Sequence, residues 1–250
     1  AAMDWGQLLT RSLAPVVDLV YPPRCPLCGE ALAAQDGLCG ACWNDLAIPG
    51  EPCCATCQRP FRSDAVENGA MCAPCLASPP RHDGIAAATL YNNASRRLVL
   101  SFKHGRAIAL APLMARLMAA RLPQDGEDWL AIPVPLHRLR LWRRGYNQSA
   151  LLAREIARLR GMPLAVDALR RRKATPSLGG LGRKARIRAL SGAIEIAPRW
   201  RSLLKGRNVL LVDDVLTSGA TSEACIGALQ RAGAAKVRIA CFARVVDEAL

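Results

Sequence analysis

The chain has 250 residues, a formal net charge of +14 and 51% hydrophobic residues. This length predicts one or two domains with a sizeable buried core. No apolar segment approaches the roughly 20 residues that a membrane-spanning helix needs. Residues 1–22 have the apolar spacing of a short amphipathic helix and lack the basic start of a secretory signal. We therefore expect a cytoplasmic protein without a membrane span.

Nine of the eleven cysteines fall before residue 76, and eight of them form four CxxC pairs. A CxxC turn directs two thiolates at one tetrahedral ion, so two such turns complete a four-sulfur zinc site. We expect residues 23–78 to form a double zinc ribbon with two structural zinc ions, since metal binding supplies folding energy that so small a segment lacks. The expected ligands are Cys25, Cys28, Cys39, Cys42, Cys54, Cys57, Cys72 and Cys75.

Other interpretations of the cysteines have less support. A redox CxxC needs a thioredoxin-like context, and a disulfide scaffold needs an oxidising compartment, and neither is indicated. Sequential pairing of the turns keeps each loop short, with an interleaved pairing as the alternative. Cys53 is a spare, because its use would give a C-x3-C turn. With four thiolates on each ion, no coordination position is left for catalysis.

A Pro-containing linker at 76–84 separates the ribbons from a segment where strand and helix patterns alternate. Strands are expected at 84–91, 128–135, 208–214 and 236–246, and helices at 94–105, 111–122, 147–161 and 221–233. This alternation predicts an α/β fold for residues 84–250, with a parallel sheet covered by helices on both faces.

The positive charge is concentrated in one central segment. Residues 137–207 contain 19 Lys or Arg against 3 Asp or Glu, a net charge of +16, whereas the rest of the chain has a net charge of −2. Such a segment favours an anionic ligand or partner. The alternative is a GC-rich coding background, because 29 of the 34 basic residues are arginine.

The stretch NVLLVDDVLTSGATSEACIGAL (208–229) joins an apolar strand, two acids, a small-residue loop and a helical pattern. Ligands of open parallel sheets bind beyond the carboxyl ends of the strands, and hydroxyls with free N–H groups at a helix start favour a phosphate. An acidic pair repels phosphate itself, so it suits the hydroxyls of a sugar attached to that phosphate. The alternative is an ordinary strand and helix with a Thr or Ser cap and two solvated aspartates.

The segment VLLVDDVLTSGAT resembles the phosphoribosyl pyrophosphate signature of type I phosphoribosyltransferases. Together with the CxxC ribbons and IPVPLHRLRLWRRGYNQSALLAREIA, the chain resembles the ComF family, whose double-zinc-ribbon proteins are linked to DNA uptake in competence. The resemblance covers roughly residues 20–246. It implies a type I phosphoribosyltransferase-like domain that binds phosphoribosyl pyrophosphate with Mg²⁺.

The resemblance also implies roles for individual residues. Asp213 and Asp214 would hold the ribose hydroxyls, and Arg143 and Arg144 would lie within reach of the pyrophosphate. The residues that would hold the 5′-phosphate are Thr217, Ser218, Gly219, Ala220 and Thr221, and those of the pyrophosphate loop include Pro135 and Leu136. Residues 170–193 resemble a mobile flap whose Lys173 and Arg183 would close over the pyrophosphate. Members of the family often have Gln after the TPS of this flap, where this chain has Leu178.

If the chain is an enzyme, arginines would stabilise the departing pyrophosphate while a nucleophile attacks the ribose C1 carbon. No segment indicates which acceptor would be used, and His104 and His137 are expected to be surface or packing residues. Two alternatives are a competence protein that handles single-stranded DNA together with other competence proteins, and a regulator that binds the ligand without turnover.

Overall fold

The computed structural model describes residues 22–35, 37–67, 69–104, 107–124, 126–172 and 192–246. Residues 1–21 of the expected N-terminal helix lie outside these ranges, as do the flap residues Lys173 and Arg183. The chain divides into two compact units, Ala1–Leu46 and Ala47–Leu250. The second cysteine segment therefore belongs to the same unit as the α/β part of the chain.

The described part of the first unit contains one CxxC turn and one short helix. A bridge between Arg24 and Ala31 closes the turn, and Gly29 adopts a φ of +79° directly after Cys28. Helix α2 (Gly40–Asn44) begins directly after Cys39 and buries Cys42. The turn thus supplies two cysteines, and α2 together with the residue before it supplies two more.

The second cysteine segment repeats this arrangement within the larger unit. A bridge between Cys53 and Pro60 closes its CxxC turn, and helix α3 (Ala73–Ala77) begins directly after Cys72. Gln58 has a φ of +53° at the position that Gly29 occupies in the first turn. The two segments are therefore structural repeats of one ribbon.

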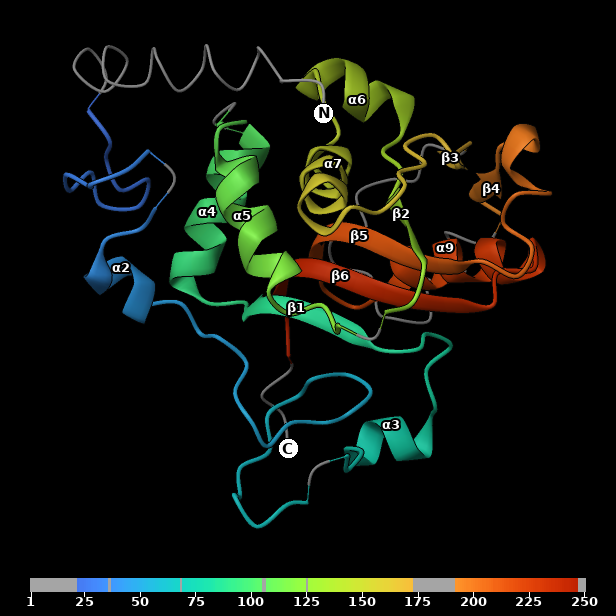
Figure 1. Ribbon diagram of the computed structural model, residues 1–250, viewed down its shortest axis with the longest axis horizontal. Coiled ribbons are helices and arrows are strands. Elements are labelled where there is room, and N and C mark those ends of the chain that lie inside the picture. The colour runs from blue at the N-terminus through green and yellow to red at the C-terminus, as the bar shows by residue number, and fades with distance from the viewer. Residues whose placement is uncertain are drawn as a thin grey trace. The chain divides into compact units, whose positions relative to one another are not determined.

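A parallel four-stranded sheet forms the centre of the second unit (Figure 1). Its strands in chain order are β1 (Ile85–Leu90), β2 (Trp129–Pro133), β5 (Asn208–Leu216) and β6 (Lys236–Arg244). Their order across the sheet is β1-β6-β5-β2, and every neighbouring pair is parallel. The parallel sheet expected from the sequence is confirmed.

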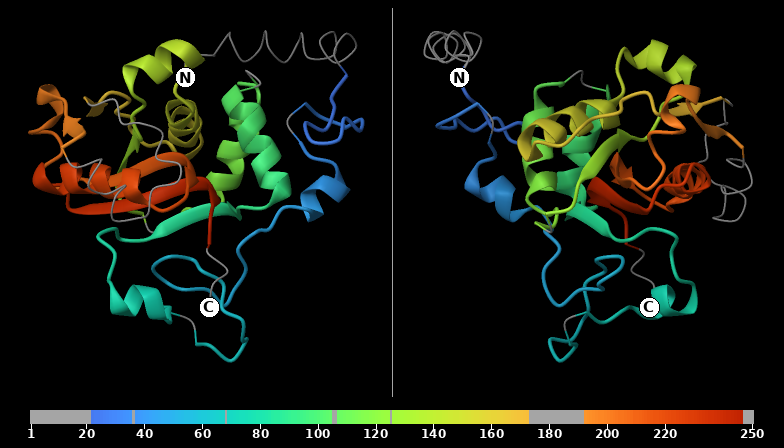
Figure 2. Two further views of the ribbon diagram at one scale, coloured as in Figure 1. Left: turned by 180° about the vertical axis from the view of Figure 1, so that it is seen from behind. Right: turned by 45° about the vertical axis from the view of Figure 1, so that its right-hand side comes forward.

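Helices cover both faces of this sheet, as expected. Helices α4 (Asn93–His104), α5 (Leu110–Ala119) and α7 (Gln148–Arg160) lie over one face, and α9 (Ala220–Arg231) lies over the opposite face (Figures 1 and 2). Helix α6 (Arg138–Arg144) was not expected, because none of its residues is buried and its seven residues show no apolar periodicity.

The face of the sheet toward α9 carries a core that includes the second ribbon. Alternate residues of a strand point to the same face, and here every strand contributes apolar residues that pack with α9, including Ala87, Leu130, Leu211 and Ile239. The same core contains the four cysteines of the second segment, Cys54, Cys57, Cys72 and Cys75. The second ribbon is thus part of the packing that stabilises the sheet.

An antiparallel pair, β3 (Leu169–Arg171) and β4 (Ile194–Ile196), completes this core through Leu169, Ile194 and Ile196. These strands flank the segment that resembles the flap. A single 3₁₀ turn, η1 (Pro198–Trp200), leads from β4 back toward β5. No helix in the described ranges is both long and apolar enough to cross a membrane.

Candidate functional site

Two adjacent acids lie on β5 at the level where the neighbouring strand ends. Pro133, the last residue of β2, pairs with Val212, and Asp213 and Asp214 follow directly. The Asp213 Oδ1 atom accepts a hydrogen bond from the Ser149 Oγ at 3.0 Å. Asp214 is 7% exposed, and its Oδ2 atom lies 3.1 Å from the Nζ of Lys103. The acids are therefore held from two helices, α7 and α4.

The Asp213 carboxyl has an unusual protonation equilibrium. Burial raises its pKa to about 7, and the neighbouring negative charge of Asp214 adds to this increase. The charge of Lys103 and the hydrogen bond from Ser149 act in the opposite direction. Near neutral pH, the Asp213 carboxyl thus exchanges a proton readily, and a ligand that donates a hydrogen bond to it would favour the charged form.

The loop that follows β5 leads directly into the N-terminus of α9. Gly219 precedes the helix with a φ of +75°, a left-handed conformation that a residue with a Cβ adopts only with strain. Within the described residues, no side chain caps this helix start. The positive end of a 12-residue helix thus lies next to three hydroxyl-bearing residues in the chain, Thr217, Ser218 and Thr221, an arrangement suited to a phosphate.

The connection from β2 to α7 supplies basic side chains. After Pro135, which is buried, and Leu136, which is partly buried, His137 caps α6 by accepting a hydrogen bond from the Leu139 N–H at 3.3 Å. Asn147 then fixes the end of this connection, because its Nδ2 donates to the Val134 carbonyl at 3.1 Å. The expected pyrophosphate loop is thus anchored at both ends.

One face of α6 and the end of α4 enclose a hollow of about 430 Å³. It is lined by Lys103, His104, Arg140, Arg143, Arg144 and Tyr146. The sequence predicted Arg143 and Arg144 as anion contacts, and the structure places both in this hollow. Lys103 also borders it, so the hollow adjoins the acid pair. We refer to it as the basic hollow.

Sequence reasoning missed Lys103 and Ser149. Lys103 is one of only five lysines in an arginine-rich chain, which is the single signal that could have drawn attention to it. Ser149 follows the RRGYNQ block that carried the family resemblance, but its contact with Asp213 depends on how α7 packs against β5. His104 was expected to be a surface or packing residue; it is exposed and also borders the basic hollow.

Gln148, the first residue of α7, leaves a buried polar atom without a partner. The residue is 1% exposed, and its Nε2 has no hydrogen-bond acceptor in the described part of the chain. An unsatisfied buried amide costs about 1–3 kcal/mol. Such an atom beside Ser149 is typical of a site whose hydrogen bonds are completed by a ligand or by water.

The cysteines group in the sequential order. The Sγ atoms of Cys25, Cys28, Cys39 and Cys42 lie within 4.8 Å of one another, and so do those of Cys54, Cys57, Cys72 and Cys75. The Cys28–Cys39 and Cys57–Cys72 sulfur distances are both 3.5 Å. Sulfurs around a tetrahedral zinc ion lie about 3.8 Å apart, since each Zn–S bond is about 2.3 Å. Both tetrads fit a structural zinc site, whereas Cys53 lies outside them.

Comparisons with known proteins agree with both parts of the chain. Residues 16–76 match the double zinc ribbon domain family, and residues 145–249 match the phosphoribosyl transferase domain family. DNA utilization protein YhgH of Escherichia coli K12 is 30% identical over 226 residues, which span 84% of this chain and 98% of that protein. Competence protein F of Haemophilus influenzae is 31% identical over 228 residues, which span 88% of this chain and 96% of that protein.

Solved structures offer more distant likenesses. A hypoxanthine phosphoribosyltransferase of Staphylococcus aureus is 16% identical, with a TM-score of 0.36, and the match covers 57% of this chain and 77% of that one.

Proposed function

The chain belongs to the ComF family, and we propose that it binds phosphoribosyl pyrophosphate with Mg²⁺ at the carboxyl end of its parallel sheet. Asp213 and Asp214 would accept hydrogen bonds from the ribose 2′ and 3′ hydroxyls. The loop 217–221 would hold the 5′-phosphate, and the basic hollow would hold the pyrophosphate. The flap residues Lys173 and Arg183 belong to the same proposal as contacts to the pyrophosphate.

One observation carries this proposal: an acidic pair lies between a helix start suited to phosphate and a hollow lined by cationic side chains. A phosphoribosyl pyrophosphate has the same order of groups, with hydroxyls between a monophosphate and a pyrophosphate. A simple phosphate would not need the acids, and a neutral sugar would not need Arg143 and Arg144. Arginine is suited to the pyrophosphate because its planar fork binds two oxygens at once.

The described residues also offer hydrogen-bond donors, acceptors and positive charge that suit the ligand together with its metal ion. The unpartnered Nε2 of Gln148 offers a hydrogen-bond donor beside Ser149, and the carboxyls of Asp213 and Asp214 offer acceptors. Mg²⁺ carried by the pyrophosphate and ribose oxygens would neutralise part of their charge. The arginines of the basic hollow would supply the remaining positive charge.

Transfer of the phosphoribosyl group is the reaction that this site would support. The bond from ribose C1 to the pyrophosphate oxygen would break, and a bond from C1 to the acceptor nucleophile would form. Arg143 and Arg144 would stabilise the negative charge on the departing pyrophosphate, and positioning would supply much of the remaining rate. A regulator would use the same site without turnover, and a screen of acceptors that follows pyrophosphate release distinguishes the two.

Calorimetric titration with phosphoribosyl pyrophosphate and Mg²⁺ tests the binding proposal. We expect saturable binding by the wild type and its loss in Asp213→Ala. Asp128→Ala is the matched control, because Asp128 is exposed and precedes β2 at the opposite end of the sheet. Equal binding by the wild type and Asp213→Ala would refute the assignment of the acids.

We place the protein in the cytoplasm, where the proposed ligand and reduced cysteine thiols are both available. None of the eight tetrad cysteines forms a disulfide. The names of the two relatives refer to competence and DNA utilization, and we extend this association to the chain as a proposal. Competence proteins are accordingly proposed partners.

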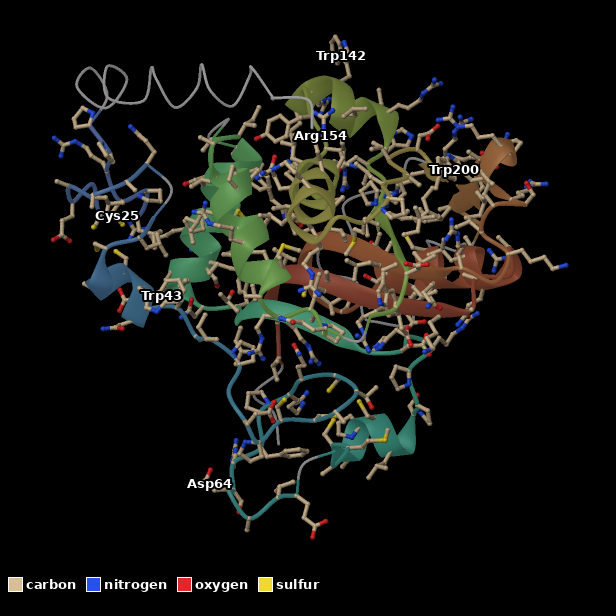
Figure 3. All side chains as sticks on the ribbon, viewed as in Figure 1. Cys25, Trp43, Asp64, Trp142, Arg154 and Trp200 are labelled. Atoms are coloured by element: carbon tan, nitrogen blue, oxygen red, sulfur yellow. The ribbon has the colours of Figure 1, made fainter. Side chains whose placement is uncertain are left out.

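A second candidate function, the handling of single-stranded DNA, is favoured by the outer face of α6. Trp142 is 85% exposed, and Figure 3 shows it projecting from α6 away from the sheet. Leu139 is 61% exposed, and Arg138 lies on the same face by helical spacing. An exposed aromatic ring beside arginine offers a stacking surface for a base together with a phosphate contact.

Fluorescence anisotropy with a labelled oligothymidine tests this function. We expect Trp142→Ala to weaken binding by about tenfold, since stacking on one aromatic ring contributes about 1–3 kcal/mol. Arg138→Ala should weaken binding and reduce its salt dependence. Trp43→Ala, an exposed tryptophan in the first unit, is the matched control. Unchanged affinity in Trp142→Ala would exclude this surface.

A further inference from the structure

Lys103 borders both halves of the proposed site. It lies in the last turn of α4, and its Nζ is 3.1 Å from the Asp214 Oδ2 atom. The same side chain lines the basic hollow together with Arg140, Arg143 and Arg144. Lys103 is the only residue of the hollow that also pairs with an acid of β5 in the described part of the chain.

The backbone of Lys103 is fixed, whereas its side chain is accessible. The Tyr146 hydroxyl donates a hydrogen bond to the carbonyl of Phe102, and the two rings lie 6.2 Å apart between centroids. Phe102 is fully buried, so the end of α4 is anchored to the connection between α6 and α7. The Lys103 side chain is nevertheless 24% exposed, and its four-carbon stem can reorient its ammonium group.

The charges around Lys103 favour a change of partner when an anion binds. The ammonium of Lys103 neutralises Asp214 beside Asp213, and the Lys103 side chain remains accessible to a second anion. A pyrophosphate in the basic hollow would bring several negative charges within reach of the same ammonium. Ribose hydroxyls would at the same time offer Asp214 new hydrogen-bond donors.

We propose that the ammonium of Lys103 moves from Asp214 to the pyrophosphate when phosphoribosyl pyrophosphate binds, an exchange of partners that determines which ligands the site accepts. This inference rests on the proposed function. When the ammonium pairs with a pyrophosphate, the Asp214 carboxylate can accept a hydrogen bond from a ribose hydroxyl. Without a pyrophosphate, the carboxylate stays paired with Lys103. The exchange therefore makes the site discriminate against ribose phosphates that lack the pyrophosphate, for which Lys103 stays on Asp214 and competes with the sugar.

The alternative is that Lys103 serves only to hold the acid pair in place. The two cases predict opposite effects on ligands that share the ribose and differ in the pyrophosphate. If Lys103 contacts the pyrophosphate, its removal lowers the affinity for ligands that carry this group and leaves the affinity for other ligands unchanged. If Lys103 only supports Asp214, its removal lowers the affinity for every ligand that contacts the acids by a similar factor.

Calorimetric titrations with three probes separate these cases, namely phosphoribosyl pyrophosphate, ribose 5-phosphate and inorganic pyrophosphate, each with Mg²⁺. The informative variant is Lys103→Met, which keeps most of the stem and removes the charge. Lys103→Arg keeps the charge. Lys205→Ala is the matched control, because Lys205 is exposed and precedes β5 at the end of the sheet away from the acids. Zinc content and the unfolding midpoint show whether each variant is folded.

We expect Lys103→Met to bind phosphoribosyl pyrophosphate and pyrophosphate at least about tenfold more weakly, as for the loss of a hydrogen bond to a charged group. Its affinity for ribose 5-phosphate should be unchanged or higher, and Lys103→Arg should restore most pyrophosphate binding. Equal weakening of phosphoribosyl pyrophosphate and ribose 5-phosphate would overturn the exchange while leaving the proposed function intact. No saturable binding of any probe by the wild type would overturn the proposed function, and the exchange with it.

Discussion

The side-chain amide oxygen of Gln58 accepts a hydrogen bond from the backbone N–H of Ala87 at 2.8 Å. Gln58 belongs to the CxxC turn of the second ribbon, and Ala87 lies on β1, the edge strand of the sheet. An edge strand has backbone groups on its outer side that need partners. The ribbon supplies one of them, so a hydrogen bond joins the second ribbon to the sheet in addition to the core that they share.

Replacement of Gln58 by Ala should destabilise the protein by about 1–2 kcal/mol, because the buried Ala87 N–H loses its acceptor. Gln58→Gly should cost less, since glycine tolerates the φ of +53° that Gln58 adopts. The free energy of unfolding in urea measures both effects. Gln124→Ala is the control at an exposed position. A Gln58→Ala variant as stable as this control would contradict a supporting role for the hydrogen bond.

The two cysteine tetrads should differ in what they stabilise. Cys75 packs in the same core as the sheet, whereas Cys42 belongs to the other compact unit. Cys75→Ser and Cys42→Ser should each lower the zinc content from about two ions per chain to about one, as expected for four-cysteine sites.

The stability of the two variants should then diverge. Loss of the second ion should lower the unfolding midpoint of the sheet, followed by circular dichroism, because structural zinc sites contribute directly to folding. Loss of the first ion should leave that midpoint near its wild-type value. Equal decreases in the two variants would show that the first ribbon also supports the sheet.

The raised pKa of Asp213 should make folding stability depend on pH. Its carboxyl has a pKa of about 7 in the folded protein against 3.8 as its ordinary value, so the folded state binds more protons between these values. The free energy of unfolding therefore falls as pH rises through this window, by up to about 1.4 kcal/mol per pH unit for this one group. Well above pH 7, the carboxyl is charged in both the folded and the unfolded state, so the decrease in the free energy of unfolding caused by this group is complete.

Asp213→Asn removes this titration and should be more stable than the wild type at pH 8, with a smaller difference at pH 5. Urea unfolding at both pH values measures the effect, and the difference between variant and wild type cancels the contribution of the cysteines. The same difference at pH 5 and pH 8 would show that the pKa of Asp213 is not raised.

The sequence predicted the parallel sheet and its covering helices because apolar periodicity and turn residues are local signals. It extended the first, second and last strands by one or two residues at their ends and ended β5 at Asp214, although the strand continues to Leu216. Strand ends depend on pairing with neighbouring strands, here of Leu216 with Arg244 of β6, which the local pattern does not contain.

The site was predictable where its residues are adjacent in sequence, as in the acid pair and the loop 217–221. The contacts of these acids come from elsewhere in the chain, with Lys103 on α4 and Ser149 on α7. Those contacts arise from the packing of helices on the sheet. Composition and spacing indicated the charged segment that contains α6, but not which of its arginines face the basic hollow.

Ser149 should tune the pH at which the proposed ligand binds. Ribose hydroxyls donate hydrogen bonds to carboxylates, so affinity for phosphoribosyl pyrophosphate should rise with pH through about 7 as Asp213 loses its proton. The hydrogen bond from Ser149 lowers the pKa of Asp213, and its removal in Ser149→Ala should raise that pKa further. The midpoint of the affinity curve should therefore move to higher pH.

Titrations of the wild type and Ser149→Ala from pH 6 to 9 measure this shift, with Ser202→Ala as the control at an exposed position before β5. Above the shifted midpoint, the affinity of Ser149→Ala should approach that of the wild type, because the carboxylate is then charged in both proteins. A uniform loss of affinity at every pH would instead mean that Ser149 contacts the ligand itself. An unchanged midpoint would show that its hydrogen bond does not control the protonation of Asp213.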